Sequence, residues 1–257
     1  MRGRGSVVGI RYIHNLRPMA RYQHRWTYGL EYRQVDNRVG LVGGSPDLVP
    51  DITVHPASIG YAATWTGEGQ QLEVSSTYVR NIPGGANGGA SAIAAARATA
   101  SADYAILRYA ANYVYTTPAD WRLRIAGEGQ YTRDALVSGE QFGIGGQDSV
   151  RGFYERSISN DTGHRITLEV QTPNLGGQFG PNSVARALIF IDQGRVRRNH
   201  PLPSEVVNAN ISSVGAGWRV SMVPSWHLRV DVAHVIQGAG IRARGDERLH
   251  FSAGFSY

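Results

Sequence analysis

The sequence predicts an all-β protein, an antiparallel transmembrane β-barrel of about eleven strands. Three observations lead to this prediction. Apolar and polar residues alternate with a period of two in one segment after another, and the connections between segments alternate between short and long. The segments also have about ten residues or more, the length that a tilted strand needs to cross a bilayer, whereas strands of globular sheets usually have ~5–6.

Length and composition favour one domain and exclude several classes of protein. A chain of 257 residues fits a single large β domain, which we expect over residues 1–257, and no run approaches the ~18 apolar residues of a membrane-spanning helix. All 26 basic residues are arginines, so sites that need a lysine are excluded, and the absence of cysteine excludes disulfides and thiolate sites. The net charge is +6, but the arginines lie singly along the strands, so no nucleic-acid partner is expected.

Reading the alternation in order gives eleven predicted strands. They cover residues 6–15, 21–34, 57–66, 71–81, 103–116, 121–135, 164–172, 183–196, 211–223, 226–236 and 248–257. The alanine-rich stretch 91–100 interrupts the long connection after the fourth strand, and both a helical turn and a loop fit its composition.

The alternation alone does not decide which face of each strand meets water, because a soluble barrel with an apolar core would show the same pattern. Strand length favours the membrane, and so do aromatic residues near strand ends, as in interfacial girdles: Trp26, Tyr28, Tyr113, Tyr115, Trp121, Trp218, Trp226 and Tyr257. In a membrane barrel the polar face lines a hydrated lumen. The lumen-lining residues expected on this basis are Arg122, Arg124, Glu128, Arg165, Glu169 and Arg229.

One connection differs from the others. The stretch 143–155 is rich in glycine, carries a single arginine, Arg151, and is too long for a hairpin turn and too apolar at its tip for a solvated loop. We therefore expect the connection 138–163 to fold inward onto the barrel wall. The candidate partner is Asp192, an acid embedded in the apolar strand segment 190–194.

Three motifs resemble those of two-partner-secretion outer-membrane transporters, the TpsB type (ShlB/FhaC/HecB family). They are Val150-Arg-Gly-Phe153 on the loop, Phe190-Ile-Asp-Gln-Gly194 on a following strand, and the aromatic last strand Phe251-Ser-Ala-Gly-Phe-Ser-Tyr257. The resemblance covers essentially the whole chain. It implies the C-terminal part of a sixteen-strand barrel, since the signal peptide, the POTRA domains and the first five strands of the family have no counterpart in these residues.

The resemblance also implies roles for individual residues. Arg151 would pair with Asp192 and lock the loop in the lumen, while Gly152 would allow close approach to the wall. Val150, Phe153, Phe190 and Gly194 would pack the loop, with Phe153 on apolar wall residues such as Phe190. Phe251, Phe255 and Tyr257 would form the C-terminal signal that the barrel-assembly machinery recognises.

The function that the resemblance implies is export of an unfolded exoprotein, of the haemolysin or adhesin kind, through the outer membrane of a Gram-negative bacterium. The partners would be this client, outer-membrane lipids and the barrel-assembly machinery. Two alternatives are a barrel-assembly insertase of the same superfamily and a passive porin-like channel. No enzyme is expected, since the sequence has no catalytic motif, and no cofactor or metal is implied because the eight histidines lack ligand spacing.

Overall fold

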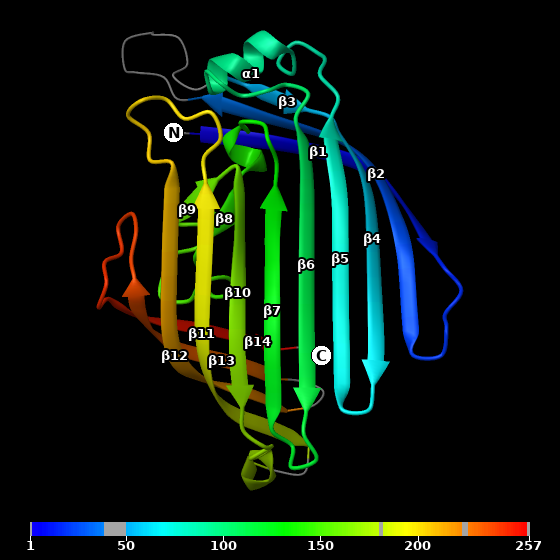
Figure 1. Ribbon diagram of the computed structural model, residues 1–257, viewed down its shortest axis with the longest axis vertical. Coiled ribbons are helices and arrows are strands. Elements are labelled where there is room, and N and C mark those ends of the chain that lie inside the picture. The colour runs from blue at the N-terminus through cyan, green and yellow to red at the C-terminus, as the bar shows by residue number, and fades with distance from the viewer. Residues whose placement is uncertain (1, 39–49, 180–181, 223–225, 256–257) are drawn as a thin grey trace.

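The computed structural model describes residues 2–38, 50–179, 182–222 and 226–255, and these form a nearly all-β structure. Its main element is an antiparallel sheet in which neighbouring strands follow one another along the chain (Figure 1). The strands on this path are β1 (Arg2–Asn15), β2 (Tyr22–Arg38), β4 (Pro56–Gly67), β5 (Gln70–Asn81), β6 (Ala105–Thr116), β7 (Arg122–Tyr131), β10 (Thr162–Gln171), β11 (Ser183–Arg197), β12 (Asn208–Met222), β13 (Trp226–Gln237) and β14 (Glu247–Phe255).

These eleven strands confirm the predicted fold class. The expected strand 121–135 ends early, at Tyr131, because the chain turns there and Asp134 accepts a hydrogen bond from the amide of Ala105 instead of continuing the ladder (2.9 Å). The sequence reading missed the short strand β3 (Ile52–Val54), which pairs with β2, and the separate hairpin of β8 (Phe142–Ile144) and β9 (Ile158–Asn160). Of the two alternatives for 91–100, the helical one is correct, as α1 spans Ala90–Ala96.

The two faces of the sheet differ in polarity in the way that a membrane barrel requires. Large apolar side chains on one face are exposed, for example Ile10 (72%), Ile189 (64%) and Phe251 (64%). Side chains of the opposite face are charged and buried, for example Glu169 and Asp192. A soluble barrel would bury the apolar face, so this arrangement decides between the two interpretations of the alternation.

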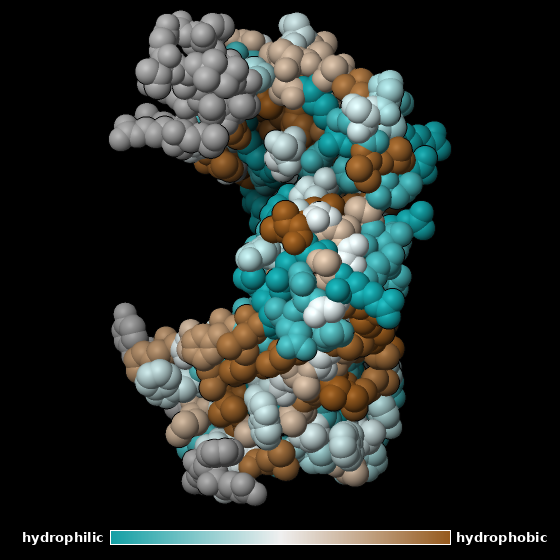
Figure 2. Space-filling view, turned by 90° about the vertical axis from the view of Figure 1, so that its left-hand side faces the viewer, coloured by the Kyte–Doolittle hydropathy of each residue, from teal (hydrophilic) through white to brown (hydrophobic). Residues whose placement is uncertain are grey.

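The sheet is curved and hollow on its polar side (Figure 2). Within the described residues, the strand order runs from β1 to β14 and no pairing joins these two edges. The hollow is partly filled by three apolar clusters, centred on Ile93 and Leu136, on Val150 and Phe153, and on Leu188 and Phe190.

The connections alternate between short and long, as predicted. Turns such as Glu68–Gly69 lie at one rim, and the longer connections lie at the other, where α1 and β3 are found (Figure 1). Two more short helical turns, η1 (Ser138–Glu140) and η2 (Gly176–Phe179), lie in connections. No helix among the described residues is long and apolar enough to span a membrane.

Candidate functional site

The candidate site is built by the connection between β7 and β10, residues 132–161, which we call the inner loop. Its tip is residues 143–155, and its base is residues 132–142 and 156–161. The β8–β9 hairpin lies where the two parts meet. Three glycines of the tip have positive φ angles that other residues adopt only with strain: Gly145 (103°), Gly146 (112°) and Gly152 (96°). This explains why the stretch is rich in glycine.

Arg151 lies at the end of the tip and binds the wall of the sheet. Its guanidinium donates two hydrogen bonds to the carboxylate of Asp192, from Nε to Oδ2 (2.7 Å) and from Nη2 to Oδ1 (2.9 Å), and its backbone amide donates a third (3.1 Å). Arg151 is 2% exposed and Asp192 is fully buried. A bidentate pair of this kind fixes the orientation of both planar groups.

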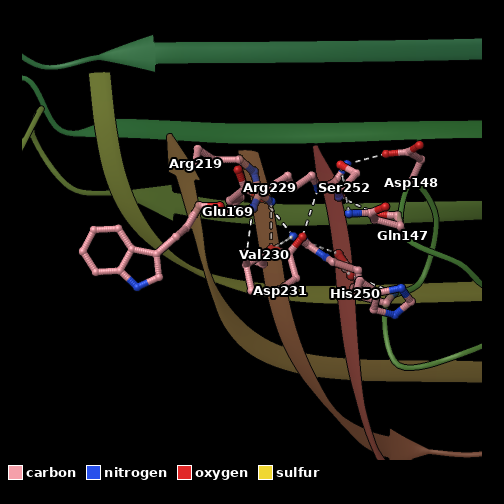
Figure 3. Close-up of polar contacts among 12 residues, drawn as sticks. Gln147, Asp148, Glu169, Arg219, Arg229, Val230, Asp231, His250 and Ser252 are labelled. Carbon is pink, nitrogen blue, oxygen red and sulfur yellow. Dashed lines mark hydrogen bonds and ion pairs between the residues drawn. The ribbon is translucent and has the colours of Figure 1, made fainter. Parts of the chain in front are cut away.

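Two further acids of the wall contact the same guanidinium. Nη1 of Arg151 lies 3.0 Å from Glu169 on β10 and 3.5 Å from Asp231 on β13. Arg219 on β12 and Arg229 on β13 each lie 2.9 Å from Asp231. Figure 3 shows both arginines pointing toward this carboxylate. The three arginines and three acids of this network carry a formal charge of 3 − 3 = 0. Burial of so many charges is tolerable because each is paired.

The tip has polar contacts with the wall besides those of Arg151. Arg229 forms an ion pair with Asp148 and donates a hydrogen bond to the carbonyl oxygen of Gln147. The amide of Gly152 donates to Nε2 of His250 on β14 (2.9 Å), and Arg242 donates to the carbonyl of Gly152 (3.1 Å). The tip therefore contacts strands from β10 to β14.

Apolar contacts complete the attachment of the tip. Val150 and Phe153 are fully buried in one cluster with Ile144, Val196, Ile211 and Val235. Gly194 leaves the room for this cluster, because a Cβ there would lie 2.9 Å from Cγ2 of Val150. A Cβ on Gly152 would similarly lie 3.2 Å from Cγ2 of Val235.

Phe153 packs on apolar wall residues, namely Val196, Ile211 and Val235, but the expected contact with Phe190 is wrong. Phe190 belongs to a different cluster, with Leu188 and Ala233. Its ring instead lies under the guanidinium of Arg151, with the Cζ atom 3.3 Å from the ring centroid. Phe190 therefore supports the arginine through a cation–π contact, because its position on β11 is two residues from Asp192 and on the same face.

A cavity of about 920 Å³ lies on the concave face beside the tip. Most of the expected lumen-lining residues border it: Arg124, Glu128, Arg165, Glu169 and Arg229. Arg122 does not, because it lies at the start of β7 near the short turns. Glu169 and Arg229 also belong to the network around Arg151, so they hold the tip as well as bordering the cavity.

The base of the inner loop is held by buried acids of the loop itself. Asp161 is fully buried and binds Arg97 through both oxygens, with Nη2 to Oδ2 at 2.9 Å. It also accepts hydrogen bonds from the amides of Leu136 (2.9 Å) and Asn199 (2.7 Å). Burial alone would raise the pKa of Asp161, but the hydrogen bonds from Arg97 and the two amides outweigh it, so the pKa lies below its ordinary value.

Several residues of the site were missed by sequence reasoning. Asp231 lies between two valines, the same signal that singled out Asp192, and could have been found. Arg219 lies on the polar face of a predicted strand and could have been included with the lumen-lining residues. Glu140 lies in η1 and Asp161 lies directly before β10, so both are outside the strands, where no alternation marks an inward direction. Within the described residues, no group of histidines and acids has the arrangement of a metal site.

The structure describes two of the three residues of the expected C-terminal signal. Phe251 (64% exposed) and Phe255 (55% exposed) lie on the apolar face of β14. Tyr257 lies outside the described residues, as does its expected place in an aromatic girdle.

Comparison with known proteins identifies the same family. The family model "Haemolysin secretion/activation protein ShlB/FhaC/HecB" matches residues 55–220, more than half of the chain. Among curated proteins, no sequence matches this chain. Among solved structures, CdiB from Escherichia coli is similar over 99% of this chain and 46% of its own (TM-score 0.77, 18% identity), and CdiB from Acinetobacter baumannii over 99% and 42% (TM-score 0.74, 18% identity).

The fold is shared more widely. BamA from Haemophilus ducreyi lacking POTRA domains 1–3 is similar over 98% of this chain and 55% of its own, with a TM-score of 0.67 and 12% identity. The chain thus spans about half the length of the structures that it resembles. The match over residues 55–220 includes the whole inner loop and Asp192, so the chain belongs to the haemolysin secretion/activation protein family ShlB/FhaC/HecB, and its sheet is that of a two-partner-secretion, TpsB-type barrel.

Proposed function

We propose that the protein exports an unfolded exoprotein of the haemolysin or adhesin kind through the outer membrane of a Gram-negative bacterium. The single observation that carries this proposal is the family match over residues 55–220, which includes both partners of the Arg151–Asp192 pair. The curved sheet supports it, because a polar concave face is suited to an extended hydrophilic chain and an apolar convex face to outer-membrane lipids.

The inner loop is the moving part in this proposal. Its tip occupies the concave face where a client would pass, and Arg151 holds it there until the client arrives. The lock depends on charge and shape together: a bidentate ion pair, the ring of Phe190 beneath the guanidinium, and glycines that let the backbone approach the wall. Arg124, Glu128 and Arg165 would line the path of the client, and the cation-rich wall would keep it solvated.

The last strand supplies a further part of the proposal. Phe251 and Phe255, together with Tyr257 in the sequence that follows, would be recognised by the barrel-assembly machinery during insertion. Alternating exposed aromatics on a terminal strand support this role.

A secretion assay in cells tests the proposed function. The full-length protein is expressed together with a candidate exoprotein of the haemolysin or adhesin kind, and the exoprotein is measured in the medium. We expect Arg151→Ala to abolish secretion while leaving the amount of barrel in the outer membrane unchanged. Arg156→Ala is the matched control, since Arg156 is an exposed arginine of the same loop. Normal secretion by the Arg151→Ala variant would overturn the lock.

A second assay separates secretion from the insertase alternative. Depletion of an insertase lowers the amounts of other outer-membrane proteins, whereas loss of a two-partner transporter lowers only its exoprotein. We expect deletion of the gene to leave the porins of the outer membrane at their normal level. A general loss of porins would favour the insertase.

A further inference from the structure

The base of the inner loop is attached to the wall by a carboxylate that no sequence motif marks. Glu140, at the end of η1, is 3% exposed although it carries a charge. Its two oxygens accept hydrogen bonds from two arginines of the wall, Oε1 from Nη1 of Arg33 (2.8 Å) and Oε2 from Nη2 of Arg108 (3.0 Å). One buried acid of the loop is therefore held between two cations.

The two arginines come from strands that are not neighbours. Arg33 lies on β2 and Arg108 on β6, which are three steps apart in the strand order β2-β4-β5-β6. Adjacent strands lie ~4.8 Å apart, so β2 and β6 are separated by roughly 14 Å along the sheet. A carboxylate that binds both must lie above the concave face between them. Glu140 thus places the loop base across the hollow of the sheet, opposite the strands that hold the tip.

Neighbouring groups fix this arrangement. Gln130 on β7 donates to the backbone carbonyl of Glu140 (2.9 Å) and accepts a hydrogen bond from Nε of Arg108 (3.0 Å). The other edge of the Arg33 guanidinium binds Glu31, with Nε to Oε2 at 2.8 Å. Each arginine therefore presents one edge to Glu140 and is oriented by a second partner, so the pairing has a defined geometry.

Apolar packing accompanies the ion pairs. Leu136 and Val137 of the base are buried in the cluster that contains Ile93 of α1, Val79 of β5 and Ile106 of β6. The base thus lies between α1 and the concave wall. Since the packing has no direction, the ion pairs of Glu140, together with the hydrogen bonds of Asp161, determine where along the wall the base sits.

We propose that Glu140, Arg33 and Arg108 form a second latch, the base latch, which holds the inner loop independently of Arg151. The inference rests on the proposed function, in which the loop moves to let a client pass. The contacts of Arg151 and its neighbours, which we call the tip latch, join the loop to β10–β14, and the base latch joins it to β2–β6. The loop spans the hollow between these two groups of strands. Full opening therefore requires release of both the tip and the base. Glu140 is a positioning residue in this device.

The test measures opening at each end separately and needs no client. The chain has no cysteine, so a single introduced cysteine reports on its own site. Val137→Cys lies at the base and Ile144→Cys at the tip, and both side chains are buried. Each is combined with Glu140→Gln in the full-length protein, and labelling by a membrane-impermeant maleimide is timed on intact cells. Glu205→Gln is the matched control, because it removes the same charge from a loop ion pair with Arg198.

We expect Glu140→Gln to raise the labelling rate at position 137 about tenfold or more, since the substitution removes both ion pairs of a buried carboxylate that two arginines orient. Labelling at position 144 should stay at its original rate, and Arg151→Ala should give the reverse pattern. Equal labelling at position 137 in the Glu140→Gln and Glu205→Gln variants would overturn the proposal. Increased labelling at both positions in Glu140→Gln would also overturn it, because general loosening is not independent release.

Secretion by the same variants then distinguishes this inference from the proposed function. One outcome is that the labelling shows two separate latches while export of the exoprotein is unaffected by opening either of them. In that case the base latch exists, and the proposed export function is wrong. If export depends on Arg151 while the labelling pattern fails, the function stands and the base latch does not.

Discussion

The tip and the base of the inner loop are both held by buried ions, but with the charges reversed. At the tip the loop supplies the cation, Arg151, and the wall supplies the acids Asp192, Glu169 and Asp231. At the base the loop supplies the acids, Glu140 and Asp161, and their partners are arginines of the wall and of the α1 connection. The difference teaches that the loop has two attachments, which respond differently to mutation.

The comparison predicts the largest effect at the tip. Arg151→Ala leaves three buried acids with two arginines, a formal charge of 2 − 3 = −1 in the network. Breaking a buried pair in this way costs about 3–5 kcal/mol. We expect the tip to leave the wall, which limited proteolysis of the folded barrel would detect as cleavage between residues 143 and 155. Arg151→Lys should keep the charge and lose the bidentate geometry, with an intermediate effect. A tip as resistant as the original protein's in Arg151→Ala would contradict the account.

The next largest effect is expected at the base. Asp161→Asn removes the charge that binds Arg97 and weakens the hydrogen bonds from Leu136 and Asn199, at a cost of about 3 kcal/mol. Three connections meet at this carboxylate, so we expect faster proteolysis in residues 82–104 and 198–207 as well as in the loop base. The tip should stay protected. Cleavage confined to the tip would show that the two ends are not separate.

The base should also respond to acid through Asp161. The pKa of Asp161 is lowered in the folded protein, so the stabilisation is present above the ordinary aspartate value of ~3.9 and is lost as the pH falls through the lower folded value. We therefore expect proteolysis of the base by an acid protease to increase below about pH 4. The Asp161→Asn variant should lack this part of the pH dependence. An identical pH profile for the two proteins would contradict the assignment.

The attachment of the tip could be predicted from the sequence, but the attachment of the base could not. Alternation in strands such as β7 and β11 fixed the fold class and placed Asp192 on the polar face, because strand geometry turns sequence position into direction. Motifs then joined Asp192 to Arg151. Glu140 and Asp161 lie outside the strands, where the direction of a side chain depends on long-range packing. Phe190 was placed on the correct face but given the wrong partner, since alternation does not show which loop atom lies above a side chain.

A smaller effect is expected from the backbone of the tip. Gly152→Ala places a Cβ at a φ of 96° and 3.2 Å from Cγ2 of Val235, with a strain of about 1–3 kcal/mol. We expect partial loss of secretion and moderate protease sensitivity at the tip. Gly139→Ala is the matched control at the base, because its Cβ would meet no atom within 4 Å. Equal effects of the two changes would contradict a close approach at Gly152.

The smallest effect is expected at the ring beneath the arginine. Phe190→Leu keeps an apolar side chain but removes the cation–π contact, which is worth about 1–2 kcal/mol at a desolvated site. Protease resistance at the tip should fall slightly, and the combination with Arg151→Ala should add little, because the contact is already lost. Additive effects in the double variant would show that Phe190 acts through another partner.

A reversible crosslink at the tip tests the central claim, that the inner loop must leave the wall for a client to pass. A Cβ built on Gly194 lies 3.4 Å from Cβ of Ile144, close to the ~3.5–4.5 Å of disulfides, and the chain has no cysteine of its own. In the full-length protein carrying Ile144→Cys and Gly194→Cys, the account predicts loss of exoprotein secretion under oxidising conditions and recovery on reduction, with both single variants unaffected by oxidant. Normal secretion by the fully crosslinked protein would contradict it.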